Sequence, residues 1–293
     1  MNNCEIISCK ILEVFLEYHT KICKKPLLII GFAILMFMCL IAIFAPYISP
    51  HNPYDQDLKN RFLSPCIEYP LGTDQFGRCI LSRLIYGSQT SLAVAVISTT
   101  IVVIIGLLVG VYAGYFKKLD GFLMRITDIM LAFPSIVITL GLVGIFGPSV
   151  PVIIFALAIP GWAKYARVTR SITLSVKNRG YVNNARALGA GDRYIIFKHI
   201  LPNSYAQVME IATLGLGGKI ISIAGLGFLG LGIQPPTSEW GTIMSQGLPF
   251  LTKAPFITLS AGTMIMIFVL ATNLIGSEIR EVLDPKSDSI VLS

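Results

Sequence analysis

The sequence contains few charged residues and few of the side chains that make up catalytic or metal sites. Asp, Glu, Lys and Arg account for 13% of the 293 residues, whereas an average soluble domain has about 25%. His19, His51 and His199 lie far apart and without ligand spacing, so no metal site is indicated. Hydrophobic residues make up 54% of the chain. This balance excludes an ordinary soluble protein and predicts an integral membrane protein.

Signs of enzymatic activity are also lacking. The nearest approach to a phosphate-binding loop, Gly217-Gly218-Lys219-Ile220, has neither the upstream glycine nor the hydroxyl residue of such loops and lies in an apolar run. We therefore expect no catalytic residue and no cofactor on this chain. The six cysteines show no Cys-x-x-Cys spacing; Cys66 and Cys79 share one compartment, where they form either a disulfide or two free thiols.

Apolar runs of about 20 residues, the length that crosses about 30 Å of hydrocarbon, predict an all-α polytopic fold. Pro151 and Pro160-Gly161 bracket the fourth run, for which a re-entrant helix is the alternative. The six predicted spans are Leu27–Ile48, Ser91–Tyr115, Ile126–Phe146, Val150–Trp162, Gln207–Leu231 and Phe256–Leu274.

Basic residues predict the orientation in the membrane. With a cytoplasmic N-terminus, 17 Lys and Arg residues lie inside and five outside, so both termini are expected in the cytoplasm. The net charge of +7 follows from this topology and requires no nucleic-acid partner. The expected segments are a cytoplasmic amphipathic stretch (1–26), a first span (27–48), an extracellular loop (49–90), a five-helix core (91–275) with a cytoplasmic loop (163–206), and a cytoplasmic tail (276–293).

A polar, basic stretch between two apolar runs carries the most information. Tyr181 to Leu188 is rich in helix formers, and Gly189 and Gly191 permit the left-handed backbone that ends a helix. Asp192 is expected to cap a second short helix, Arg193–Ile200, which Pro202 would terminate. Two short helices meeting at a glycine form a compact protrusion suited to docking a partner. The alternative is an ordinary solvated loop.

The order of residues in this stretch resembles the signature loop of permease subunits from binding-protein-dependent ABC importers. In that family Glu-Ala-Ala is followed by a glycine and later by a Leu-Pro pair; Ala185, Gly189, Leu201 and Pro202 match in register. Asn183 and Asn184 replace the Glu and the first Ala, so no Glu salt bridge is available here. The residues that the resemblance assigns to ATPase coupling are Asn183, Asn184, Ala185, Arg186, Ala187, Leu188, Gly189, Asp192, Leu201 and Pro202.

The resemblance extends over nearly the whole chain. Leu71-Gly-Thr-Asp-Gln-Phe-Gly-Arg78, Phe228-Leu-Gly-Leu-Gly232 and Asn273-Leu-Ile-Gly276 are similar to segments of the peptide and nickel branch, and the long outer loop is similar to that of its second, C-type permease. The resemblance implies a bacterial plasma-membrane complex with a second homologous permease, two ATPase subunits that bind ATP and Mg, and an extracellular solute-binding protein. Ser238-Glu-Trp-Gly241 looks slightly more like nickel-type permeases. Nickel or a metal chelate is therefore the expected cargo, with di- or oligopeptides as the close alternative.

The fifth predicted span is the candidate for the translocation pathway. Gly218, Gly225 and Gly232 recur every seven residues, as expected for one face of a helix, and Lys219 falls near mid-membrane. Small residues on such a face either pack against other helices or line a route. Lys219 is expected to face the interior, where it contacts either cargo carboxylates or a helix carbonyl. A stand-alone secondary transporter or channel is the rival reading, although no convincing internal repeat supports it.

Overall fold

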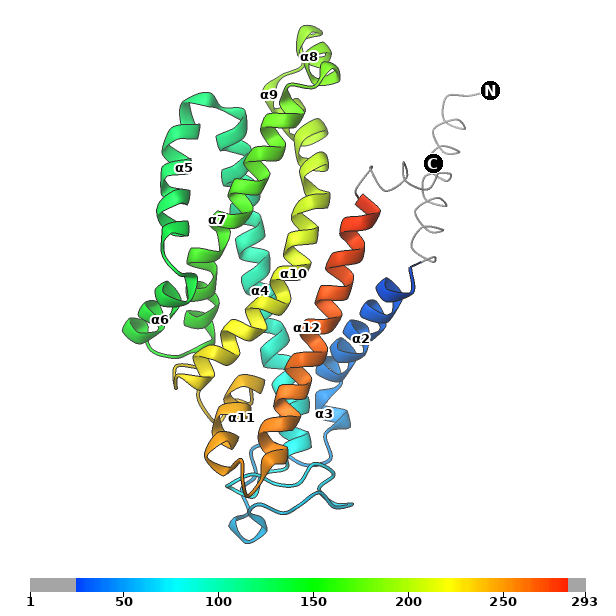
Figure 1. Cartoon of the computed structure of the whole chain (residues 1–293), viewed down its shortest axis with the longest axis vertical. Helices are drawn as coiled ribbons and strands as arrows, with labels where there is room; N and C mark the ends of the chain where they lie inside the picture. The colour runs from blue at the N-terminus through cyan, green and yellow to red at the C-terminus, as the bar shows by residue number, and fades with distance from the viewer. Residues whose placement is uncertain (1–24, 284–293) are drawn as a thin grey trace.

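The computed structural model describes residues 25–283 of the chain. Within that range the regular elements are all helices, arranged as an elongated bundle (Figure 1). The amphipathic character expected for residues 1–26 falls almost wholly outside the described residues, as does the end of the expected tail. The long helices are α2 (Pro26–Ile43), α4 (Ile80–Tyr115), α5 (Lys117–Ala132), α6 (Ser135–Phe146), α7 (Val150–Lys177), α10 (Leu201–Phe228) and α12 (Pro255–Leu283).

Short elements gather at the two ends of the bundle. At one end lie α8 (Gly180–Ala187), α9 (Asp192–Ile195) and the π-helical turn η2 (Ile196–Ile200). At the opposite end lie α11 (Trp240–Gly247) and the mostly irregular segment 49–79 (Figure 1). Short helices α3 (Ala45–Ile48), η1 (Leu58–Asn60) and η3 (Leu248–Phe250) also belong to this second end. We call the two ends the α8 end and the α11 end.

Among residues 25–283, five helices are long and apolar enough to cross a membrane, and a bent helix pair gives a sixth crossing if it counts as one span. The pair is α5 and α6, which meet at an angle of 84°. The predicted span Ile126–Phe146 is therefore not one continuous helix, because the chain bends between Ala132 and Ser135. Phe133 adopts extended backbone (φ −96°, ψ 141°) because Pro134 disfavours the helical conformation of the residue before it.

The fourth predicted span, by contrast, is a continuous 28-residue helix, α7, with Pro160 inside it. The re-entrant alternative was wrong. Pro160 cannot donate to the carbonyl of Ala156, but the Thr139 hydroxyl of α6 lies 3.1 Å from that carbonyl and shares its one proton between it and the Ser135 carbonyl at 2.9 Å. The helices also extend further than predicted, since α4 begins at Ile80 and α7 continues to Lys177.

Helices α4 and α7 form the central pair of the bundle. Gly106, Gly110 and Gly114 of α4 repeat every four residues, and a Cβ added at each would lie only 2.4–2.6 Å from the Cβ of Tyr165, Thr169 or Thr173 of α7. These positions therefore require glycine, which lets the two backbones approach closely in lipid. Larger residues at any of them would force α4 and α7 apart.

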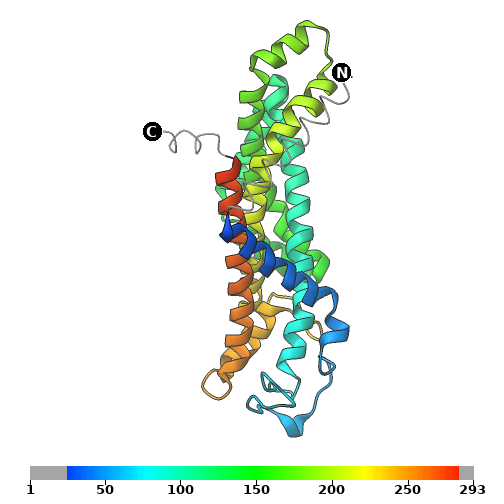
Figure 2. The same ribbon diagram turned by 90° about the vertical axis from the view of Figure 1, so that its right-hand side faces the viewer.

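The N-terminal helix α2 lies obliquely across α12 (Figure 2). Gly31 makes this approach possible, since a Cβ there would lie 2.8 Å from the Ile275 side chain. Lys25, just before α2, pairs with Glu278 at 2.9 Å and also with Glu281. The described cysteines, Cys39, Cys66 and Cys79, are free thiols.

Candidate functional site

The protrusion at the α8 end is built as a helix, a tight turn and a second helix. Gly189 adopts a left-handed backbone (φ +88°), and the bonds Gly189 N–H to Arg186 C=O and Ala190 N–H to Ala185 C=O, each 3.0 Å, close the end of α8. This pair of bonds is the Schellman arrangement, which glycine makes without steric cost. The predicted role of Gly189 is thus seen in the backbone. We call residues 180–200 the knob.

Two expected details of the knob were wrong. Gly191 is not left-handed (φ −70°) and itself occupies the N-cap position, so Asp192 does not cap α9 with its side chain. Pro202 does not end a helix either, because α9, η2 and α10 follow one another without a break. Pro202 is the second residue of α10, and the wide π turn η2 directly precedes that helix.

The knob is fastened to the end of α4. The Tyr115 hydroxyl donates to Asp192 Oδ1 at 2.5 Å and accepts from Arg186 Nη2 at 3.3 Å. Lys177 Nζ donates to the Gly114 carbonyl at 2.6 Å. Val182 of α8 is fully buried, in one apolar cluster with Val111 of α4. The turn between the two short helices is thereby held at a fixed position relative to the central helix pair.

A second fastening was not anticipated from the sequence. The His199 ring lies 5.4 Å from the Tyr181 ring and 5.6 Å from the Tyr194 ring, joining α8, α9 and η2 in one aromatic cluster. Asn203 Nδ2 donates to the Tyr181 hydroxyl at 3.4 Å. The only signal for these contacts was the aromatic content of the stretch, which does not specify partners.

The residues expected to couple to an ATPase lie mostly on the outside of the knob. Leu188 at its tip is 90% exposed, a large apolar side chain for which the described chain offers no cover. Asn183, Asn184, Arg186, Ala187 and Gly189 are exposed beside it. Ala185 and Leu201 are partly buried, while Asp192 and Pro202 lie on the surface between the tip and α10.

The glycines of α10 fall into two groups. Gly217 and Gly227 pack closely, with added Cβ atoms 2.7 Å from Thr272 Oγ1 and 2.9 Å from the Gly241 carbonyl carbon. Gly218 and Gly225 face open space. Gly232 lies beyond the end of α10 at Phe228, so the predicted seven-residue stripe of three glycines on one helix was wrong.

Lys219 lies beside the Pro160-Gly161 step of α7. Its Nζ donates to the Leu157 carbonyl at 2.7 Å, and a Cβ on Gly161 would meet that Nζ at 2.9 Å. Of the two contacts predicted for Lys219, a cargo carboxylate or a helix carbonyl, the structure shows the helix carbonyl. Within residues 25–283, Lys219 forms no ion pair within 4.0 Å.

A buried ionic cluster lies at the α11 end. The sequence pattern from Leu71 to Arg78 includes two of its residues, Asp74 and Arg78, but predicted no role for them. Asp74 Oδ2 accepts from Arg78 Nε at 2.7 Å and from Arg83 Nη1 at 2.6 Å, and all three side chains are at most 5% exposed. Arg83 Nη2 continues the network to Gln246 of α11 at 3.0 Å. Asp74 therefore holds the segment 49–79, the start of α4 and α11 together.

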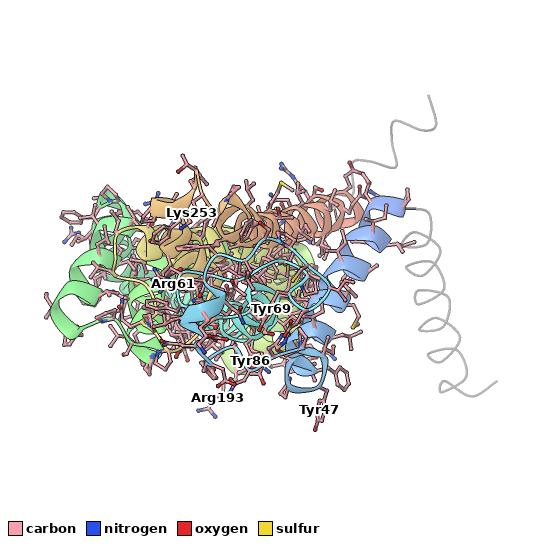
Figure 3. The ribbon with its side chains drawn as sticks, turned by 90° about the horizontal axis from the view of Figure 1, so that it is seen from below. Tyr47, Arg61, Tyr69, Tyr86, Arg193 and Lys253 are labelled. Atoms are coloured by element: carbon pink, nitrogen blue, oxygen red, sulfur yellow. The ribbon has the colours of Figure 1, made fainter. Side chains whose placement is uncertain are left out.

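The other end of α11 is fixed by Glu239. Its carboxylate accepts from the N–H groups of Gly241 and Thr242, both at 2.8 Å, and from the Ser91 hydroxyl of α4 at 3.1 Å. Full burial raises the pKa of the Glu239 carboxyl, an effect that these hydrogen bonds oppose. Seen from the α11 end, Arg61, Tyr69 and Lys253 lie over the bundle and Tyr47 at its margin (Figure 3).

Residues 102–289 match the family described as the binding-protein-dependent transport system inner membrane component. The chain belongs to this family. Residues 19–65 also match the N-terminal TM domain of oligopeptide transport permease C. The protein is thus a multi-pass permease subunit of an ABC importer and a transport subunit rather than an enzyme. Membership of this family replaces the alternative prediction of a stand-alone secondary transporter or channel.

Three curated relatives show how similar this permease is to named systems. The dipeptide permease DppC of Alkalihalophilus pseudofirmus is 41% identical, with 93% of this chain and 90% of the relative covered. The di/tripeptide permease DppC of Pseudomonas aeruginosa is 40% identical (86% and 86%), and the glutathione permease GsiD of Pectobacterium atrosepticum is 34% identical (93% and 91%).

A solved structure agrees in fold. The inward-facing MetNI methionine ABC transporter superposes with a TM-score of 0.59 at 20% identity, and the match covers 70% of this chain and 98% of that chain. The all-α importer fold expected from the sequence is confirmed.

Proposed function

We propose that this permease subunit moves short peptides across the plasma membrane of a bacterium. A solute-binding protein would deliver the peptide at the α11 end, a second homologous permease would complete the pathway, and two ATPase subunits would drive the cycle from the α8 end. ATP and Mg would bind to those subunits. The names of the three relatives, which are peptide and glutathione permeases, support this cargo class. The preference for nickel drawn from local sequence gains no support from them.

The orientation rests on the charges of the α8 end. Arg167, Arg170, Lys177 and Arg179 lie on α7 or directly after it, and Arg186 and Lys198 lie within the knob. Basic residues concentrate on the cytoplasmic side of membrane proteins. We therefore assign the α8 end and both termini to the cytoplasm.

The observation that supports the coupling role is that the tip of the knob is exposed and apolar while its turn is fixed to α4. Leu188 is 90% exposed, yet the turn beneath it is fixed to α4 through Tyr115 and Asp192. A large apolar side chain held in water is typical of an anchor that fills a pocket of a partner. Motion of an ATPase gripping this tip would pass directly into α4 and α10.

The experiment that tests the cargo uses the complete transporter reconstituted with its solute-binding protein in vesicles. We expect ATP-dependent uptake of labelled dipeptide that unlabelled di- and tripeptides inhibit and that a nickel chelate does not. Uptake of nickel with no inhibition by peptides would overturn the peptide assignment.

For the pathway, the open face of α10 is the proposed lining, with Gly218 and Gly225 leaving space and Lys219 beside them. An ammonium group carries three donors, and Leu157 takes one of them. The remaining donors can bind the terminal carboxylate of a peptide as it passes.

Replacing Lys219 with methionine tests this contact. A hydrogen bond to a charged group contributes about 1.5–3 kcal/mol, so uptake of a free dipeptide should fall about tenfold or more, measured with labelled peptide. Uptake of the same dipeptide with an amidated C-terminus should fall much less. Lys219→Arg, which keeps the charge, serves as the control. Equal losses for both peptides would mean that Lys219 only supports α7.

A further inference from the structure

A pocket of about 250 Å³ lies between the end of α4 and the base of the knob. Leu108, Val111 and Tyr112 of α4 form one wall, and Ile196 and Phe197 of η2 form the other. Asp192 and Arg193 of α9 also line it. We call this the α4–η2 pocket. Its walls are apolar apart from the two charged residues and the Tyr112 hydroxyl.

The pocket faces the side of the bundle rather than its interior. Tyr112 is 47% exposed and Phe197 is 70% exposed, although both belong to the apolar wall. The apolar run of α4 ends near this level, at Tyr115-Phe116, and Lys117 and Lys118 follow directly. Aromatic residues followed by lysines mark the level at which the hydrocarbon of a bilayer meets its headgroups.

The two charges at the pocket differ in their availability. Asp192 accepts the hydrogen bond of Tyr115. Arg193 has no ion pair within 4.0 Å among the described residues, and it projects beyond the side of the bundle in the view along the long axis (Figure 3). An apolar wall with a free guanidinium at its edge complements a molecule that joins a hydrocarbon chain to a phosphate.

We propose that the α4–η2 pocket binds an anionic phospholipid of the leaflet at the α8 end. One acyl chain packs against Tyr112 and Phe197, and the phosphate lies at Arg193. The volume suits part of a chain, because sites for whole small molecules occupy about 300–1,000 Å³. This inference requires only that the chain is embedded in a membrane, and not the proposed cargo.

Bound lipid would affect coupling through the knob. Ile196 and Phe197 belong to η2, the turn that joins the knob to α10, and Val111 belongs to the helix on which the knob is fastened. A chain in the pocket fills the space between these elements. Lipid would therefore support the knob in the position that Tyr115 and Asp192 define.

The test measures lipid retained by the purified complete transporter. The complex is equilibrated in nanodiscs of equal phosphatidylglycerol and phosphatidylcholine, and lipid that stays bound after transfer to detergent is counted by native mass spectrometry. We expect phosphatidylglycerol to be retained in preference. Arg193→Gln should lower that preference about fivefold, the effect of one basic residue near an anionic surface. Lys198→Gln, at an exposed basic residue of η2 that does not line the pocket, should leave it unchanged.

A second pair of variants tests the apolar wall. Leu108→Trp fills the pocket from an exposed position and should reduce retention of both lipids, whereas Ile104→Trp, on the same helix but outside the pocket, should not. Equal retention in all four variants would overturn the proposal, as would a wild type that shows no preference for phosphatidylglycerol. A photoreactive residue in place of Leu108 should crosslink to lipid. Crosslinking to protein instead, either residues 1–24 or the second permease, would assign the pocket to that segment and also overturn it.

Discussion

Replacing Asp74 with asparagine should destabilise the subunit by about 3–5 kcal/mol. The carboxylate compensates two arginines that are almost fully buried, Arg78 and Arg83, and removing one partner from a buried ion pair leaves an uncompensated charge. Both arginines bind Oδ2, and the other oxygen, Oδ1, accepts from the backbone N–H groups of Phe76 and Arg78 at 2.8 and 3.0 Å. The thermal midpoint of the purified subunit in detergent, followed by intrinsic fluorescence, measures the loss.

Asp55→Asn provides the matched control. Asp55 lies in the same outer segment and is exposed, and its side chain accepts a hydrogen bond from Asn52 Nδ2 at 2.9 Å. Exposed polar contacts of this kind contribute little, so the midpoint should change by no more than the error of the measurement. If both variants melt alike, the Asp74 cluster is not what holds the α11 end together.

The contacts of the Asp74 cluster could not be predicted from local sequence. The stretch from Leu71 to Arg78 was matched as a family pattern, but a pattern does not show that Arg83 lies on the Asp74 carboxylate or that Gln246 accepts a hydrogen bond from Arg83. Gln246 is 163 residues from Arg83, and only the packing of α11 against α4 brings them together. Local residue order identified the segment, and long-range packing gave it a physical role.

Prolines illustrate the same limit within the membrane. The rule that proline disrupts helices applied at Pro134, where the chain bends by 84° between α5 and α6, and failed at Pro160, where α7 continues. The carbonyl freed by Pro160 has a donor, Thr139, from another helix. No sequence window around Pro160 contains that donor. The sequence prediction accordingly placed a boundary at Pro160-Gly161 and one span across Pro134, and the structure shows the reverse.

One contact between helices could have been predicted from the sequence. Gly106, Gly110 and Gly114 have the four-residue spacing that brings helices close in lipid, and they form the contact between α4 and α7. The sequence prediction instead placed a glycine face on α10. In the knob, Gly189 was predicted correctly because its turn closes through neighbouring residues, while the role of Asp192 depended on Tyr115, 77 residues away.

Replacing Gly189 with valine should uncouple the permease from its ATPases. A Cβ at Gly189 would meet nothing within 4 Å, so space is not the constraint; the constraint is the backbone angle of φ +88°. A left-handed conformation costs an L-residue about 1–2 kcal/mol, and a β-branched residue more. Relaxing that strain would open the two bonds that close α8 and move Leu188. We expect ATPase subunits that co-purify with the permease, and ATP-dependent peptide uptake, to fall about tenfold or more.

Two further variants separate the backbone angle from the added side chain. Gly180→Val adds the same atoms to the same knob, also in open space, but within helix α8, where no left-handed angle is required. It should leave ATPase recruitment and uptake close to wild type. Gly189→Asn should retain most of both, because asparagine tolerates the left-handed region better than other residues. If Gly189→Val recruits ATPase and transports as well as Gly180→Val does, the turn at Gly189 does not position a docking surface. Gly180→Val controls for the added atoms and Gly189→Asn for their position at the tip, so a loss confined to Gly189→Val arises from the backbone angle.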